Sequence, residues 1–179
     1  GPPSASAGAV DVIVCIDISG SMEPAMPTMR DLLGRLASRL KPVDRLCAIT
    51  FHGEADLLLG WTEATPDGRD EMHEAFKGLE CGGCTAFCPA IDMILAQLGA
   101  RSEPWRAAQV LFLSDGLSNE EKGDAVVSHI AAGLPTIGVS FCTVGLTDQS
   151  DADLMCQLSR HGKGAYIYVD GEATVGDAF

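Results

Sequence analysis

The stretch VDVIVCIDISGSM (10–22) decides the fold expected for this chain, because an apolar strand passes directly into a polar loop within it. Its first part is near-continuously apolar and rich in β-branched residues, which is typical of a strand buried on both faces. Asp17, Ser19 and Ser21 then follow in alternation, and side chains two residues apart in an extended segment point the same way. Gly20 allows the backbone to turn tightly between the two serines. We therefore expect three oxygen-bearing side chains to converge just beyond the end of the first strand.

The rest of the chain alternates between apolar runs and segments of helical period. Strands are expected at 10–18, 45–52, 55–62, 109–116, 136–145 and 164–170, and helices at 26–40, 65–80, 89–100, 120–134 and 151–161. Only the turn Gly53-Glu54 separates the second and third strands, so these two must run antiparallel. The alternation elsewhere predicts an α/β fold, with a doubly wound, mostly parallel six-stranded sheet, one antiparallel edge strand and helices on both faces.

Length and charge limit the organisation and the partners of the chain. We expect residues 1–8 to be a tag remnant or flexible lead-in, and residues 9–179 to form one domain that is truncated at or before its last helix. No apolar run approaches the roughly 18 residues of a membrane span, and no signal peptide opens the chain. The formal net charge of −13 disfavours nucleic acid and anionic membranes as partners. It permits divalent cations and basic protein surfaces.

The seven cysteines bear on the cellular compartment in which the protein resides. Cys15, Cys47 and Cys142 lie inside apolar runs, where cysteine acts as a small hydrophobic residue. An odd number of cysteines in a chain of this size is not a disulfide framework. The sequence therefore favours an intracellular protein, cytoplasmic or nuclear. An extracellular adhesion domain stays open as the alternative, and counting the free thiols distinguishes the two.

Two of the predicted strands end in an acid next to a hydroxyl. Asp17 and Asp115 would lie side by side if these two strands are neighbours. In open parallel α/β sheets, ligands bind outside the carboxyl ends of the strands, which is where both acids would lie. Two close carboxylates repel each other, so a shared proton, a reaching Arg30 or Lys122, or a divalent cation must offset the repulsion. The loop between two helices brings Thr85 to the same edge. Hydroxyl and carboxylate oxygens are hard ligands, which suit Mg²⁺ or Mn²⁺.

These motifs carry a resemblance to a known family. DISGSM (17–22), after an apolar strand, resembles the DxSxS signature of von Willebrand factor A domains. GGCT (82–85) resembles the second element of that family, and LSDG (113–116) resembles the third. VDRLCAITF (43–51) and the hairpin after it are similar to the second and third strands of the family. The resemblance covers nearly the whole chain, and three elements in order are far more specific than DxSxS alone.

The resemblance implies a metal-ion-dependent adhesion site. In such a site the hydroxyls of Ser19, Ser21 and Thr85 would bind Mg²⁺ directly. Asp17 and Asp115 would act mainly through water and balance the charge. An acidic side chain of a protein partner would complete the coordination. The resemblance thus implies a protein-binding module within a larger polypeptide or complex, in a family that is not, as a rule, catalytic.

Other interpretations compete with this one. The run CGGCTAFC places Cys81, Cys84 and Cys88 in one loop, but a zinc site needs four ligands and only three are local. The same thiols leave a redox-sensitive module open. A metal-independent scaffold within an intracellular assembly is the main alternative. Enzymes are disfavoured, because neither a G-x-S-x-G element with a histidine base nor a phosphate-binding loop is present in the sequence.

Overall fold

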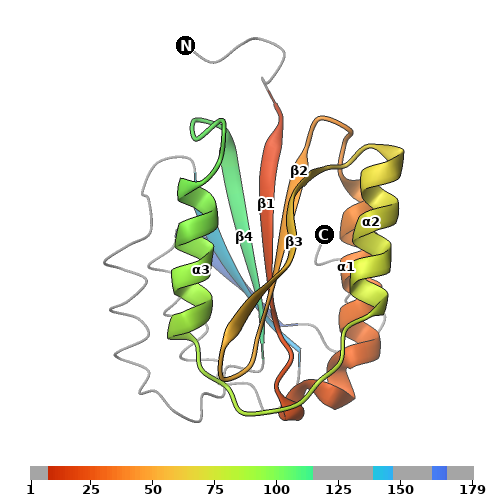
Figure 1. The fold of residues 1–179 in the computed structure, drawn as a ribbon, viewed down its shortest axis with the longest axis vertical. Helices are drawn as coiled ribbons and strands as arrows, with labels where there is room; N and C mark the ends of the chain where they lie inside the picture. The colour runs from red at the N-terminus through yellow and green to blue at the C-terminus, as the bar shows by residue number, and fades with distance from the viewer. Residues whose placement is uncertain (1–7, 115–138, 147–162, 169–179) are drawn as a thin grey trace.

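The computed structural model describes residues 8–114, 139–146 and 163–168 of the chain, and its strands form one sheet (Figure 1). The order across the sheet is β3-β2-β1-β4-β5-β6. All neighbouring strands pair parallel except β2 and β3, which pair antiparallel at the edge. The strands are β1 Val10–Asp17, β2 Arg45–Phe51, β3 Ala55–Glu63, β4 Ala107–Ser114, β5 Val139–Gly145 and β6 Lys163–Tyr168. The prediction of a mostly parallel α/β sheet with one antiparallel edge strand is confirmed.

Helices cover both faces of this sheet. The helical elements are the 3₁₀ helix η2 Gly20–Ala25 and the α-helices α1 Met26–Arg39, α2 Pro66–Lys77 and α3 Cys88–Gly99. In Figure 1, α1 and α2 lie on one side of the strands and α3 on the other. The helices expected at 120–134 and 151–161 lie outside the described residues.

The first strand is buried on both faces, as its composition predicts. Val12, Val14 and Ile16 pack in the core cluster that contains the inner residues of α1 and α2. Ile13 and Cys15 point the other way, into the cluster beneath α3. Alternation of side chains along a strand produces this division, so β1 is the central element of both layers.

Local signals in the sequence account for where the helices begin. Pro27, Pro66 and Pro89 lie in the first turns of α1, α2 and α3. A backbone N–H in the first turn of a helix has no acceptor within that helix, so proline, which lacks the N–H, loses no hydrogen bond there. The fixed φ of proline also matches the helical value. At α2 the side chain of Thr65 also accepts a hydrogen bond from the backbone N–H of Gly68, at 3.2 Å. The starts of α1 and α3 follow loops at the carboxyl edge of the sheet, whereas α2 begins at the amino edge, where Glu63 at the end of β3 pairs with Arg45.

Four aromatic rings fix the region under α3. Phe51 and Phe112 stack with their centroids 5.2 Å apart, and Phe87 meets Phe112 edge-on at 5.3 Å. Phe141 of β5 extends the cluster, with its centroid 5.7 Å from that of Phe112. Phe87 is fully buried and lies two residues after Thr85. The aromatic packing therefore anchors the end of the loop that carries this threonine.

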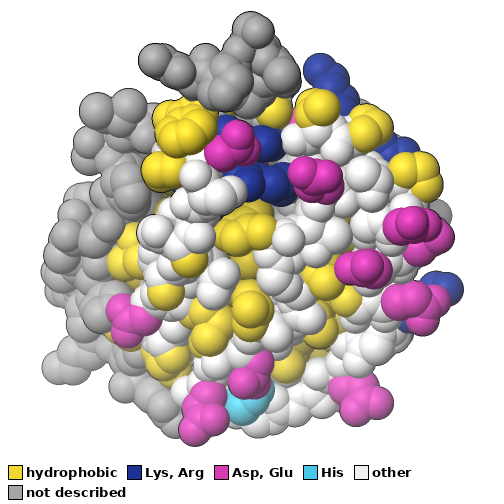
Figure 2. All heavy atoms as spheres, turned by 45° about the horizontal axis from the view of Figure 1, so that its top comes forward, with side chains coloured by type: hydrophobic (Ala, Val, Ile, Leu, Met, Phe, Trp, Pro, Cys, Tyr) yellow, Lys and Arg dark blue, Asp and Glu magenta, His cyan; other side chains and the backbone are white. Residues whose placement is uncertain are grey.

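A buried ion cluster lies at the opposite, amino end of the sheet. The side chain of Asp11 is wholly buried and accepts two hydrogen bonds from Arg45, at 2.6 and 2.8 Å. Nη1 of Arg101 lies 3.2 Å from the same carboxylate, and Nε of Arg106 lies 3.0 Å from it. Nη1 of Arg106 also pairs with Glu103 at 3.1 Å. Figure 2 brings this end forward and shows dark blue side chains gathered between magenta ones.

This cluster was not predicted from the sequence. Asp11 stands in a run that reads as almost continuously apolar, and its presence there was the one available signal. Its hydrogen bonds raise the pKa of the Arg45 guanidinium. A buried carboxylate needs cationic partners to offset its desolvation, and here these come from segments up to 95 residues away along the chain.

Candidate metal centre

Asp17 is the last residue of β1, and its carboxylate is held in one orientation. The residue is wholly buried. Oδ1 accepts hydrogen bonds from the backbone N–H of Ser19 at 2.9 Å and from its hydroxyl at 2.6 Å. Oδ2 accepts a hydrogen bond from the hydroxyl of Ser114, at 2.6 Å. Because Ser114 ends β4, the carboxylate links the ends of two neighbouring strands.

The side chains of the DISGSM loop converge as predicted, but not for the reason predicted. Ser19 Oγ lies 3.3 Å from Ser21 Oγ, and Ser19 is buried while Ser21 is exposed. Ser19 has an extended backbone, whereas Ser21 already belongs to the 3₁₀ helix η2. The turn into η2, and not a continued strand, therefore brings the second hydroxyl back toward the first.

The spacing of the two hydroxyls fits one small cation. Adjacent ligands of an octahedral Mg²⁺ ion, each about 2.1 Å from the metal, lie about 3.0 Å from each other. The observed separation of 3.3 Å between Ser19 Oγ and Ser21 Oγ is close to that value. With the carboxylate of Asp17 beside them, the described residues supply hard oxygen atoms of the kind that Mg²⁺ and Mn²⁺ select.

The loop that carries Thr85 is hydrogen-bonded to the DISGSM loop through the backbone. The N–H of Gly82 donates to the carbonyl of Ile18 at 2.8 Å, and the N–H of Gly20 donates to the carbonyl of Gly83 at 3.1 Å. Gly83 has a φ of +85°, which favours glycine. Thr85 itself is 1% exposed. The structure therefore places the loops of the first and second motifs side by side.

A second set of contacts supports the Thr85 loop from β2. The N–H of Ala86 donates to the carbonyl of His52 at 2.8 Å. A Cβ atom added at Gly53 would lie only 2.7 Å from Sγ of Cys84. The turn after β2 thus packs closely against the residue that precedes Thr85, and sequence reasoning did not identify this support.

The acid of the third motif is not described. Asp115 and Lys122 both lie outside the described residues, so their places in the site stay predictions. Ser114, the preceding residue, is described and contacts Asp17. The neighbouring positions of β1 and β4, on which the prediction of two adjacent acids depended, are confirmed. Arg30, the other cation named as able to offset the repulsion between the acids, donates a hydrogen bond to the carbonyl of Leu79, at 2.5 Å.

The cysteines of the described residues form no disulfide, and no group of three or more His, Cys, Asp or Glu side chains there is arranged to hold a metal. Burial raises the pKa of Cys81 to about 11, and the charges of Asp17 and Glu23 contribute. A thiol with a raised pKa is a poor nucleophile near neutral pH. This weighs against Cys81 as a redox centre. Cys84 is the exposed member of the group.

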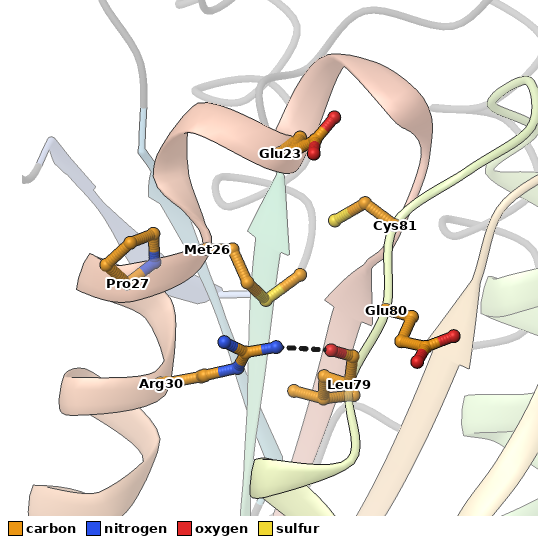
Figure 3. A pocket seen from close by; sticks show the side chains of 7 residues that line it. All are labelled: Glu23, Met26, Pro27, Arg30, Leu79, Glu80 and Cys81. Atoms are coloured by element: carbon orange, nitrogen blue, oxygen red, sulfur yellow. Dashed lines mark hydrogen bonds between the residues drawn. The ribbon is translucent and has the colours of Figure 1, made fainter.

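A pocket of about 450 Å³ lies beside these loops (Figure 3). One wall is the start of α1, and the other is the segment that leads into the Thr85 loop. Glu23, which follows Ser21 by two residues, lies at the end nearest the candidate metal centre. The pocket is lined by Glu23, Met26, Pro27, Arg30, Leu79, Glu80 and Cys81.

The sequence profile of the von Willebrand factor type A domain matches residues 12–118. This range is more than half of the chain and contains all three motifs. The chain therefore belongs to the von Willebrand factor type A domain family. A comparison with curated protein sequences finds no match.

Solved structures share the fold at low sequence identity. A von Willebrand factor type A protein from Catenulispora acidiphila is 18% identical with a TM-score of 0.81, covering 95% of this chain and 40% of its own. The conserved hypothetical protein BatB from Bacteroides thetaiotaomicron is 18% identical with a TM-score of 0.75, and 94% of each chain is covered. Proximal thread matrix protein 1 from the mussel byssus, solved with a zinc-occupied metal-ion-dependent adhesion site, is 15% identical with a TM-score of 0.73, covering 95% of this chain and 44% of its own. At these identities the likeness shows the fold alone.

Among the described residues, none of the helices has the length and apolar character needed to cross a membrane.

Proposed function

We propose that this domain binds a protein partner through a divalent cation, Mg²⁺ or Mn²⁺. Ser19, Ser21 and Thr85 would hold the cation through their hydroxyls, with Asp17 and Asp115 acting mainly through water. The observation that carries the proposal is the 3.3 Å approach of the two serine hydroxyls beside a fixed, buried carboxylate. When bound, the cation supplies a Lewis-acidic position that accepts a carboxylate from the partner.

The residues of the chain prepare this position before any cation arrives. Ser114 and the backbone of Ser19 orient Asp17, so little side-chain entropy is lost on binding. Thr85 is buried in a loop that two backbone hydrogen bonds tie to the first motif. The partner would offer an Asp or Glu side chain, because a hard cation among hydroxyls prefers an anionic oxygen. We propose binding and not catalysis as the activity of the domain.

Thermal unfolding in chelator and in excess Mg²⁺ or Mn²⁺ tests the proposal. A cation that binds only the folded state at about 100 times its Kd stabilises by about 2.7 kcal/mol, which raises Tm by about 5–10 °C. Ser21→Ala removes one hydroxyl at an exposed position and should abolish most of this rise. Ser38→Ala makes the same chemical change at an exposed position of α1, where the hydroxyl donates to the carbonyl of Gly34. This control should keep the full rise.

Two outcomes would contradict the proposal. The first is an equal Tm of the wild-type protein in chelator and in cation, and the second is a Tm rise in Ser21→Ala as large as that in Ser38→Ala. Either result would favour a metal-independent scaffold, which would bind its partner through other surfaces.

A further inference from the structure

The cations of this acidic domain are unevenly distributed. The chain has a net charge of −13, yet the helix α1 carries Arg30, Arg35 and Arg39, and all three are exposed. They line one groove of about 430 Å³ on the outer side of α1, next to α2. The arginines of the amino-end cluster are buried around Asp11 and do not contribute to this surface. The α1 groove is therefore a local concentration of exposed positive charge.

Gly34 leaves space in the middle of the α1 groove. A Cβ atom added there would lie 3.9 Å from ring atoms of His73, which belongs to α2 and also lines the groove. A glycine inside a helix is unfavourable by about 0.5–1 kcal/mol relative to alanine. Here its missing side chain lets the groove reach down between the two helices.

The guanidinium groups of the α1 groove keep hydrogen-bonding capacity. Asp31, the acid in the groove, accepts from Nε of Arg35 at 3.1 Å, and both side chains are about half exposed, at 49% and 48%. Arg30 donates one nitrogen to the carbonyl of Leu79, as Figure 3 shows. Among the described residues Arg39 forms no ion pair. The α1 groove is thus lined by three guanidinium groups and one carboxylate, and each guanidinium carries five N–H donors.

The spacing of Arg35 and Arg39 along α1 matches that of alternate residues in an extended peptide. With a rise of about 1.5 Å per residue, Arg35 and Arg39 are separated by about 6 Å along the axis and, four residues apart, lie on one face of α1. Arg30 lies about 7.5 Å before Arg35 and about 140° around the axis, where it donates to the carbonyl of Leu79. Alternate residues of an extended strand are about 6.6 Å apart and point the same way. Arginine binds carboxylates in a planar, two-pronged geometry.

We propose that the α1 groove binds a short extended segment of a protein partner that carries Asp or Glu at alternate positions. A long nucleic acid fits less well, because the strongly negative remainder of the domain would repel a polyanion. Arg30 also lines the pocket beside the candidate metal centre, so one acidic segment is able to run from the groove toward that centre. The inference does not depend on the proposed function, since the arginines act without a cation.

A labelled peptide with the pattern Glu-Ser-Glu-Ser-Glu tests the inference by fluorescence anisotropy, in chelator and at low ionic strength. The matched peptide has Gln in place of each Glu. The variant Arg35→Gln with Arg39→Gln removes two cations from the groove and keeps good helix-forming residues. The control, Lys41→Gln with Lys77→Gln, removes two exposed cations that do not line the groove.

The groove variant should bind the Glu peptide about tenfold more weakly, since each exposed ion pair contributes a few-fold, and the control should stay within about twofold of wild type. Binding should also weaken as salt is added. Equal binding of the Gln peptide, or an equal loss in both double variants, would overturn the inference. Tighter binding of a single-stranded oligonucleotide, lost in the groove variant, would replace the acidic peptide with nucleic acid. Because chelator is present throughout, the result is independent of the thermal test of metal binding.

Discussion

Replacing Asp11 by Asn should destabilise the domain severely, although this residue is far from the candidate metal centre. The change removes the charge that compensates Arg45, Arg101 and Arg106 while their guanidinium groups stay buried. Their side chains are 10%, 4% and 7% exposed, and that of Asp11 is fully buried. Removing one member of a buried ion pair costs about 3–5 kcal/mol. Because single domains are stable by about 5–15 kcal/mol in total, this loss is a large part of the whole.

Urea denaturation followed by circular dichroism measures this loss as a lower midpoint at unchanged slope. The matched control is Asp31→Asn, which makes the same chemical change in a pair that is about half exposed on both sides. Exposed pairs contribute about 0–1 kcal/mol, so the control should be nearly neutral. If Asp11→Asn lost less than about 1 kcal/mol, or no more than the control, the cluster would not be the stabilising element that its burial indicates.

Further predictions concern the glycines and the thiols. Gly34→Ala should raise the free energy of unfolding by about 0.5–1 kcal/mol, because the new methyl group meets only ordinary contacts with the ring of His73; a lower Tm would contradict this. Gly83→Ala should lower stability by about 1–2 kcal/mol, since its φ is +85°, and should reduce the Tm rise given by Mg²⁺; an unchanged cation response would separate this loop from metal binding. Burial raises the pKa of Cys47 from 9.0 to about 12, so its contribution to stability is complete below pH 9 and is lost as the pH rises from 9 toward 12. Between pH 8 and 10 the wild type should therefore lose about 1.4 kcal/mol more than Cys47→Ala does; parallel curves would contradict the burial of this thiol. An intracellular location stays a prediction from the cysteine pattern; it predicts seven reactive thiols in freshly purified, denatured protein, and several disulfides would instead indicate an oxidising compartment.

Much of the fold follows from local features of the sequence. The run that ends at Asp17 is long, apolar and β-branched, so its burial on both faces is fixed wherever its neighbours lie. The short turn that contains Gly53 and Glu54 permits only an antiparallel pair. Prolines mark the first turns of the three described helices. These features act over a few residues through sterics and periodicity, which is why they can be read without knowledge of distant contacts.

The candidate metal centre was predictable only in part. The alternation of Asp17, Ser19 and Ser21 indicated oxygen ligands, but their convergence depends on the turn into η2, which periodicity did not reveal. The approach of the Thr85 loop depends on backbone hydrogen bonds to Ile18 and Gly20. Backbone N–H and C=O groups are the same in nearly every residue type, so no sequence motif predicts such bonds.

The charge pattern was decided by the tertiary structure alone. The sequence shows twelve Lys and Arg residues but not which of them are buried around Asp11 and which line the α1 groove. Asp11 finds its partners 34, 90 and 95 residues away. Arg30, Arg35 and Arg39 become one surface only when α2 packs against α1 and sets His73 beside Gly34. Strands and helices follow from interactions over a few residues, whereas the energy of a charge depends on every group near it in space, and only folding brings those groups together.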